Sequence, residues 1–262
     1  MRVLVTGAGR AIGAATVRLL AERGHDVVAT ARDPSLLDGL PAVRRLALDV
    51  RDRASVGAAL EAAGAVDAVV NNAALNARGP LEAVPLDVVR DVFDTNVFGP
   101  LALVQSLAPA WRDRGSGVFV NISSIQGRVA TPLEGAYSAS KHALEAISDA
   151  LHYELGHFGV RTVVIQPGYI APGMKPGSRH PGPDDYGDLW VQWEGTDDRV
   201  TGPGGRPGPD VVAEAVARAI EDPDCPRRLR VGADAEMVLG ARDQLDDPAF
   251  EAAMRSVLGM TW

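Results

Sequence analysis

The chain opens with Arg2-Val3-Leu4-Val5-Thr6-Gly7-Ala8-Gly9-Arg10-Ala11-Ile12-Gly13. The apolar run before Thr6 predicts a short buried strand, and the spacing after the glycines predicts a helix over residues 11–23. A glycine turn between a strand and a helix lets backbone N–H groups approach a pyrophosphate at the positive end of the helix dipole. We therefore expect a phosphate-bearing cofactor here; a tight turn without a ligand is the alternative.

Strand and helix patterns alternate along the rest of the 262 residues. We expect α/β architecture: one doubly wound Rossmann-type domain over residues 1–262, with helices on both faces of a seven-stranded parallel sheet of order 3-2-1-4-5-6-7. After the first strand, the sequence predicts strands at 26–31, 43–48, 66–70, 118–122, 160–166 and 229–231. It predicts helices at 52–63, 85–113, 135–157, 209–221 and 247–258.

The end of the second predicted strand bears on the choice of dinucleotide. An acid at this place binds the ribose 2′-hydroxyl of NAD, whereas a nearby arginine accommodates the 2′-phosphate of NADP. Here Ala31 stands at the acid's place and Arg32 follows, which favours NADP(H). Asp33 could pair with Arg32 instead, so NAD(H) stays possible, and a solvated surface arginine is a further alternative.

A second informative stretch runs from Ser123 to Lys141. Tyr137 and Lys141 are four residues apart, so on a helix their side chains share one face. A free phenol titrates near pH 10, too high for good acid/base catalysis at neutral pH, and an adjacent ammonium lowers that pKa. The spacing predicts a proton-transfer device, although a surface tyrosine and lysine can share this spacing by chance.

Four motifs together resemble the short-chain dehydrogenase/reductase family. They are the glycine stretch from Thr6 to Gly13, Asn71-Asn72-Ala73-Ala74, Ser124 placed thirteen residues before the tyrosine, and Tyr137-Ser138-Ala139-Ser140-Lys141. The resemblance covers nearly the whole chain in order. It implies a catalytic set of Asn96, Ser124, Tyr137 and Lys141, in which Asn96 holds a water for proton relay to Lys141.

The resemblance also implies a set of residues that hold the cofactor. Arg10 occupies a place where NADP-preferring members carry a basic residue, and the Asn71–Ala74 stretch lines the dinucleotide. Asp49 accepts from the adenine amino group, and Lys141 binds the nicotinamide ribose. The full set is Thr6, Gly7, Gly9, Arg10, Ala11, Ile12, Gly13, Arg32, Asp49, Val50, Asn72, Ala73, Ala74, Tyr137, Lys141, Pro167, Gly168 and Ile170.

Three positions depart from the family pattern. Ala11 replaces the middle glycine, Ala74 replaces a glycine, and Pro172 stands where a threonine usually bonds the nicotinamide carboxamide. Proline supplies neither a hydroxyl nor an N–H. The contacts that hold the nicotinamide carboxamide near Pro172 must therefore differ from those of the family pattern.

Residues 172–209 are rich in Gly, Pro and Asp and lack aliphatic periodicity. A loop of this length in a compact domain is typically functional, and in relatives this region is the variable substrate lid. We expect it to be partly ordered, since it carries aromatic residues that could cover a substrate. The candidate substrate residues are Gln126, Tyr169, Tyr186, Trp190 and Trp193.

Composition limits the classes of partner. The net charge of −8 argues against a nucleic acid or an anionic membrane as the main partner, and no apolar run is long enough for a membrane span. The lone Cys225 cannot form an internal disulfide, and the chain enters a strand directly, so we expect a cytoplasmic protein without a signal peptide. The five histidines show no metal-ligand spacing, so we expect no metal.

The sequence thus predicts an NADP-dependent oxidoreductase that interconverts a ketone and a secondary alcohol. Tyr137 would act as general acid/base, and Ser124 would bind the reacting oxygen. We expect a small-molecule carbonyl or alcohol substrate and, from the resemblance, a homodimer or homotetramer. Two alternatives remain: a catalytically silent nucleotide-binding regulator, and an epimerase of the same fold that uses transient oxidation.

Overall fold

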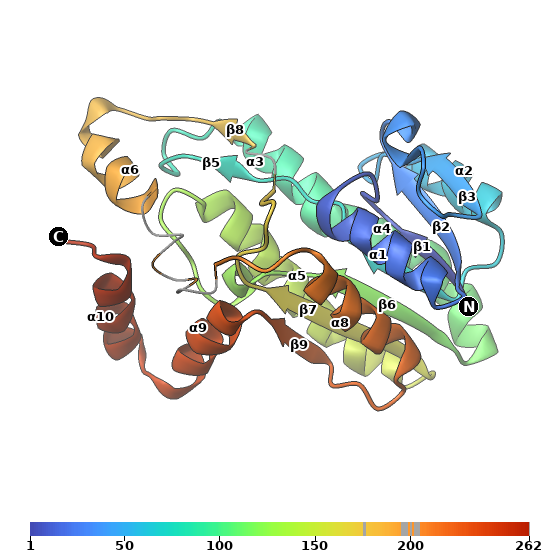
Figure 1. Ribbon diagram of the computed structural model, residues 1–262. Coiled ribbons are helices and arrows are strands. Elements are labelled where there is room, and N and C mark those ends of the chain that lie inside the picture. Colours follow the sequence, from blue (N-terminus) through green and yellow to red (C-terminus); the bar gives the residue numbers. More distant parts are fainter. Residues whose placement is uncertain (175–176, 195–198, 200, 202–204, 262) are drawn as a thin grey trace.

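Parallel strands form the centre of the computed structural model, which describes residues 1–174, 177–194, 199, 201 and 205–261 (Figure 1). The main sheet has seven strands in the order β3-β2-β1-β4-β6-β7-β9, which confirms the predicted order. The strands are β1 (Arg2–Val5), β2 (Asp26–Ala31), β3 (Arg44–Ala47), β4 (Ala68–Asn71), β6 (Gly117–Ile122), β7 (Val160–Pro167) and β9 (Arg228–Val231).

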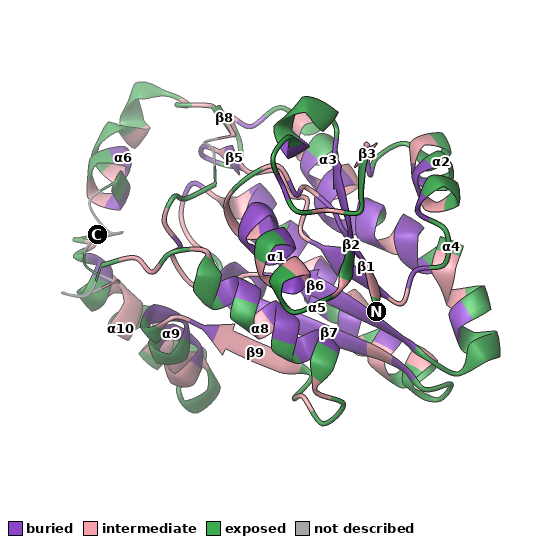
Figure 2. Ribbon diagram, turned by 45° about the vertical axis from the view of Figure 1, so that its right-hand side comes forward, coloured by how far each residue is buried: buried purple, intermediate pink, exposed green. Residues whose placement is uncertain are grey.

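Alternation along the strands sends apolar side chains into two cores. Val3 and Val5 belong to one core, while Leu4 between them belongs to the other, because successive strand residues point to opposite faces. The first core is covered by α1 (Ala11–Glu22) and α8 (Asp210–Glu221). The second is covered by α2 (Arg53–Ala63), α4 (Gly99–Arg114) and α5 (Gly135–Gly156). The central strands β1, β2, β4, β6 and β7 between these layers are almost continuously buried, whereas the edge strands β3 and β9 are not (Figure 2).

The single helix predicted over 85–113 is interrupted. It consists of α3 (Leu86–Phe93), one π-helical turn η2 (Asp94–Phe98) and α4. Pro100 has no N–H, so the Asn96 carbonyl lacks the partner that a regular α-helix would give it. The chain takes the wider turn instead, in which the Gly99 N–H bonds to the carbonyl of Asp94.

The structure adds elements that the sequence did not predict. They are the paired strands β5 (Ala77–Arg78) and β8 (Ser178–Arg179), helices α6 (Gly187–Glu194) and α9 (Ala233–Gln244), and the short turns η1 (Pro34–Leu37), η3 (Ile125–Gly127) and η4 (Asp184–Tyr186). The terminal helix α10 (Asp247–Leu258) was predicted. Within the described residues, no helix has the length and apolar character needed to cross a membrane.

Candidate active site

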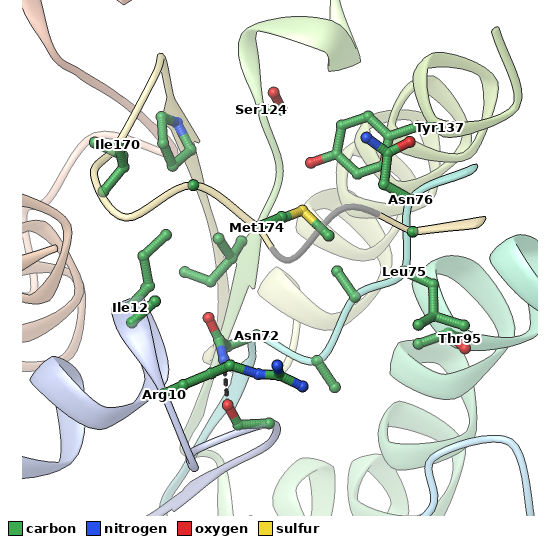
Figure 3. A pocket seen from close by; sticks show the side chains of 18 of the residues that line it. Arg10, Ile12, Asn72, Leu75, Asn76, Thr95, Ser124, Tyr137, Ile170 and Met174 are labelled. Atoms are coloured by element: carbon green, nitrogen blue, oxygen red, sulfur yellow. Dashed lines mark hydrogen bonds between the residues drawn. The ribbon is translucent and has the colours of Figure 1, made fainter. Parts of the chain in front are cut away.

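A long pocket lies at the carboxyl ends of the parallel strands, where open α/β sheets bind their ligands. Its volume of about 490 Å³ is typical of a small-molecule site. Arg10 lies at one end, and Ser124 and Tyr137 lie at the other (Figure 3). Of the predicted cofactor and catalytic residues, those lining it are Gly7, Gly9, Arg10, Ala11, Ile12, Arg32, Asp49, Val50, Asn72, Ala73, Ala74, Ser124, Tyr137, Lys141, Pro167, Gly168 and Ile170.

The glycine turn is shaped for close approach. Gly7 has φ +62°, and a Cβ there would lie 2.9 Å from the Cα of Ala73. Helix α1 begins at Ala11, and the Arg10 side chain makes no capping hydrogen bond, so the first N–H groups of the helix are available to an anion. Ala11, which replaces the family's glycine, adopts φ +42°, so the backbone keeps a left-handed turn despite the side chain.

Thr6 and Gly13 were predicted to contact the cofactor, but in the structure they stabilise the glycine turn from outside the pocket. The Thr6 hydroxyl accepts hydrogen bonds from the N–H groups of Asn72 and Ala73, both at 3.0 Å. A Cβ on Gly13 would lie 2.4 Å from the carbonyl of Gly7, which requires glycine for helix–turn packing. Thr6 and Gly13 are not among the lining residues. They hold the shape of the turn.

The asparagines of the third motif have different roles. The Asn72 amide donates to the carbonyls of Thr6 and Gly7, at 2.9 and 3.0 Å, and its side chain lines the pocket (Figure 3). Asn71 is buried and donates to Asn121 at 2.8 Å. The expectation that the whole Asn71–Ala74 stretch lines the pocket therefore holds from Asn72 onward and fails for Asn71, whose side chain is buried against Asn121 of β6.

Basic residues gather at the glycine end of the pocket. Arg10 and Arg32 are exposed and line it. Asp33 caps the turn η1, accepting from the Ser35 N–H and hydroxyl, and this lowers the pKa of its carboxyl. Its carboxylate is thus engaged by Ser35. Arg51 was not predicted; it also lines the pocket and pairs with Asp49 at 2.9 Å, which lowers the pKa of that carboxyl.

Ser124, Tyr137 and Lys141 come together at the other end. Tyr137 and Lys141 lie one turn apart on α5, as predicted, and both are buried. The Lys141 ammonium donates to the carbonyl of Ile122 at 2.7 Å and lies 5.6 Å from the centroid of the Tyr137 ring. Ser124 caps the start of η3, accepts from the Gln126 N–H at 3.2 Å, and hydrogen-bonds the Tyr137 hydroxyl.

The predicted lowering of the tyrosine pKa is wrong for this environment. Burial and the negative charge of Glu134 raise the pKa of Tyr137, while the hydrogen bond with Ser124 acts in the opposite direction. Burial also lowers the pKa of Lys141 to about 8, against the opposing effect of Glu145. Desolvation by burial is the largest cause of both shifts. At neutral pH the phenol keeps its proton.

The Asn96 side chain binds the backbone of Leu75. It lies in the π-helical turn, and its side chain accepts from the N–H of Leu75 and donates to the Leu75 carbonyl, both at 2.8 Å. It also donates to the Ser140 hydroxyl at 2.9 Å. The side chain does not line the pocket. It fixes the Leu75 backbone next to α5, and its predicted place in a proton relay stays a prediction.

The Pro167–Gly168 turn is held by a residue that the sequence analysis missed. The Tyr169 N–H donates to the carboxylate of Asp234 at 2.6 Å, and Asp234 is buried at the start of α9. A Cβ on Gly168 would lie 2.1 Å from the same carboxylate, so only glycine fits. No local pattern in the sequence indicated α9, so its contribution to the pocket could not be predicted.

The aromatic residues of the 172–209 segment do not lie where we expected. Trp190 and Trp193 are buried in a hydrophobic cluster with α9 and α10, and Tyr186 packs against the same cluster. None of the three is among the residues lining the pocket, whereas Tyr169 and Gln126 are. Burial of the indole rings against apolar residues of the two helices removes apolar surface from water and favours this packing. The segment is instead attached to the pocket wall through the β5–β8 pair.

The fold and the Ser-Tyr-Lys arrangement define a dinucleotide-binding oxidoreductase of the α/β class. A family model described as short chain dehydrogenase matches residues 1–181. The chain belongs to the short-chain dehydrogenase/reductase family, which binds NAD(P)(H).

Characterised relatives and solved structures agree with this assignment. The chain is 36% identical over 176 residues to a 3-ketodihydrosphingosine reductase of Bacteroides thetaiotaomicron, covering 66% of this chain and 65% of the relative. It is 35% identical over 191 residues to the mouse dehydrogenase/reductase SDR family member 7B, covering 66% of this chain and 58% of that protein. The aligned region thus spans less than two thirds of both relatives.

Solved structures match over nearly the full chain. A short-chain dehydrogenase from Streptomyces avermitilis has a TM-score of 0.79 at 31% identity, with 97% of this chain and 98% of that chain covered. A short chain dehydrogenase from Burkholderia cenocepacia, solved in complex with NADP, has a TM-score of 0.76 at 26% identity, with 100% and 98% covered.

Proposed function

We propose that this protein is an NADP-dependent oxidoreductase that interconverts a ketone and a secondary alcohol, with Tyr137 as general acid/base. The observation that carries the proposal is the placement of Ser124, Tyr137 and Lys141 at one end of a pocket whose other end is a glycine turn with free helix N–H groups. The chemistry that a bound nicotinamide supplies is hydride transfer to the carbonyl carbon.

The residues fit such a cofactor. The uncapped start of α1 suits the pyrophosphate, and the close packing at Gly7 keeps the backbone clear of it. Arg10 and Arg32 suit the 2′-phosphate, since Ser35 engages Asp33. The Pro167–Ile170 segment suits the nicotinamide end, where Pro172 also lines the pocket. The Lys141 ammonium is suited to the nicotinamide ribose.

In the proposed reaction the protein supplies one proton to the substrate. The Tyr137 hydroxyl donates its proton to the carbonyl oxygen as the carbon gains hydride, and Ser124 hydrogen-bonds the same oxygen. Burial and Glu134 raise the pKa of Tyr137, so the phenol carries its proton at neutral pH. Solvent then reprotonates the tyrosine.

The substitution Tyr137→Phe tests the proposal. It removes the proton donor and keeps the ring, so we expect kcat for ketone reduction to fall by about 10²- to 10⁴-fold while the Kd for NADPH changes little. Steady-state NADPH oxidation and fluorescence titration measure the two quantities. Full activity in this variant would reject the assignment of Tyr137.

We also propose that the chain forms a homodimer or homotetramer in the cytoplasm. Phe98, at the end of η2, and Tyr153, on α5, support the assembly because they leave large apolar side chains 55% and 71% exposed.

A further inference from the structure

Glu134 places a carboxylate beside the proposed proton donor. It immediately precedes α5 and lines the pocket, three residues before Tyr137. Its charge is one of the causes that raise the pKa of Tyr137. A negative charge here opposes the build-up of negative charge on a reacting carbonyl oxygen. The carboxylate therefore works against the chemistry unless it has another role.

Helix capping does not account for this residue. Glu134 occupies the N-cap position of α5, but its side chain makes no capping hydrogen bond, and glutamate is not among the favoured N-cap residues. The side chain instead accepts from the Asn76 amide at 3.0 Å and from the Gln126 amide, and it pairs with Arg78 at 3.4 Å. The Ser138 hydroxyl donates a hydrogen bond to the side-chain amide oxygen of Gln126 at 2.8 Å. These contacts hold the carboxylate rigidly at the pocket wall.

Asn76 adds an unused acceptor. Its amide nitrogen is committed to Glu134, and its side-chain oxygen finds no hydrogen-bond partner among the described residues. An unpaired buried acceptor is costly unless a donor reaches it. Asn76 lines the same pocket and lies at the same end as Tyr137 (Figure 3). The Glu134 carboxylate also keeps spare capacity, since two oxygens offer about four acceptor sites.

We propose that Glu134 and Asn76 bind a hydroxyl group of the substrate, so that the substrate is a hydroxy ketone or the corresponding diol. This rests on the proposed ketone reduction. Glu134 immediately precedes the helix that carries Tyr137, and both residues line the pocket, so a hydroxyl close to the carbonyl group is the one they would bind together. A neutral hydroxyl fits better than an ammonium, because Arg78 and Lys141 already place positive charge around this end.

Three substrates that differ in one group test the proposal. Propiophenone, 2-hydroxyacetophenone and 2-aminoacetophenone carry methyl, hydroxyl and amine on the same skeleton, and hydroxyacetone and aminoacetone with butan-2-one form a smaller set. The readout is the ratio of kcat/KM for the hydroxyl compound to that for the methyl compound, with NADPH. We expect Glu134→Leu to lower this ratio by about 10- to 100-fold, and Glu134→Gln, which keeps an acceptor, to lower it less. Asn76→Leu should lower it as well.

The ratio separates recognition from general damage, since misfolding or a shifted Tyr137 pKa affects both substrates. Glu154→Leu is the matched control: Glu154 is exposed on the same helix, and its ratio should equal that of the wild type. An unchanged ratio in Glu134→Leu, with ketones still reduced, would overturn this inference and leave the proposed function standing. Preference for the aminoketones would overturn the hydroxyl assignment. Failure of the wild type to reduce any of the ketones would remove the proposed function and this inference together.

Discussion

Lys141 has a pKa close enough to neutrality for its charge to change within the pH range of an activity assay. Burial lowers the pKa of its ammonium to about 8, so the group is charged below that pH and neutral above it. We predict that kcat/KM for ketone reduction falls as pH rises through about 8. The reason is the loss of a positive charge that stabilises negative charge on the reacting oxygen. The measurement is a pH profile of kcat/KM with NADPH.

Lys141→Arg is the matched control for this profile. A guanidinium is not deprotonated in proteins, so the variant keeps its charge at every pH tested. We expect lower activity, because the planar group cannot repeat the contact with the Ile122 carbonyl, but no alkaline fall near the wild-type midpoint. The same fall in both enzymes would assign the titration to a different group.

Arg10 and Arg32 carry the predicted cofactor preference. Both are exposed at the glycine end of the pocket, where a 2′-phosphate would lie. Since a hydrogen bond to a charged group contributes about 1.5–3 kcal/mol, we expect alanine at either position to weaken NADPH binding by about 10- to 100-fold. NADH binding should change little. Calorimetric titration of both cofactors measures the difference.

The exposed Arg44 on β3 provides the control for these two substitutions, since it does not line the pocket. Arg44→Ala should bind both cofactors as the wild type does. If the wild type prefers NADH, or if Arg10→Ala and Arg32→Ala weaken both cofactors equally, the NADP preference is wrong.

At the scale of elements, the β5–β8 pair attaches the 172–209 segment to the pocket. β8 can approach only because residue 177 is glycine: a Cβ there would lie 1.3 Å from the Asn76 carbonyl oxygen. We predict that Gly177→Ala separates the two strands and raises KM for the ketone by about tenfold, a loss of about 1.4 kcal/mol. NADPH affinity should stay near the wild-type value, since the glycine turn is at the other end of the pocket.

Gly187, at the start of α6, is the matched position in the same segment. An added Cβ there meets no atom within 4 Å, so Gly187→Ala should leave KM unchanged. Steady-state kinetics with one ketone at saturating NADPH compare the two variants. A wild-type KM in Gly177→Ala would mean that the β5–β8 pair does not shape the substrate end.

Local sequence signals predicted the elements that build the sheet but not those that close the pocket. The central strands of the main sheet carry apolar runs that mark their positions, and the order of the sheet followed from the alternation of strands and helices behind one glycine turn. β5 and β8 have two residues each and lie about a hundred residues apart, so no local pattern marks them. The π-helical turn depends on one proline, Pro100, inside an otherwise helical pattern.

The same limit applies to the site. The Tyr137–Lys141 spacing is local and was predicted from sequence, as was the glycine turn. The sequence analysis missed Glu134, Arg51 and Asp234. Each of them contacts a residue that is distant in the sequence, and no local pattern reveals such a contact. The aromatics Trp190 and Trp193 were placed wrongly, since composition does not reveal whether a tryptophan faces a pocket or a core. The raised pKa of Tyr137 likewise depends on burial, which spacing does not give.

At the level of the whole molecule, we propose that hydride passes from NADPH to a carbonyl carbon in this pocket while Tyr137 supplies the proton. The most direct test uses NADPH that carries deuterium at the transferring position of the nicotinamide, with 2-hydroxyacetophenone and propiophenone as ketones. Mass spectrometry and NMR of the alcohol product locate the label. We predict that the wild-type protein places deuterium on the carbinol carbon and that the Tyr137→Phe variant forms almost no product. An alcohol without deuterium, or bound NADPH with no alcohol formed from either ketone, would contradict it.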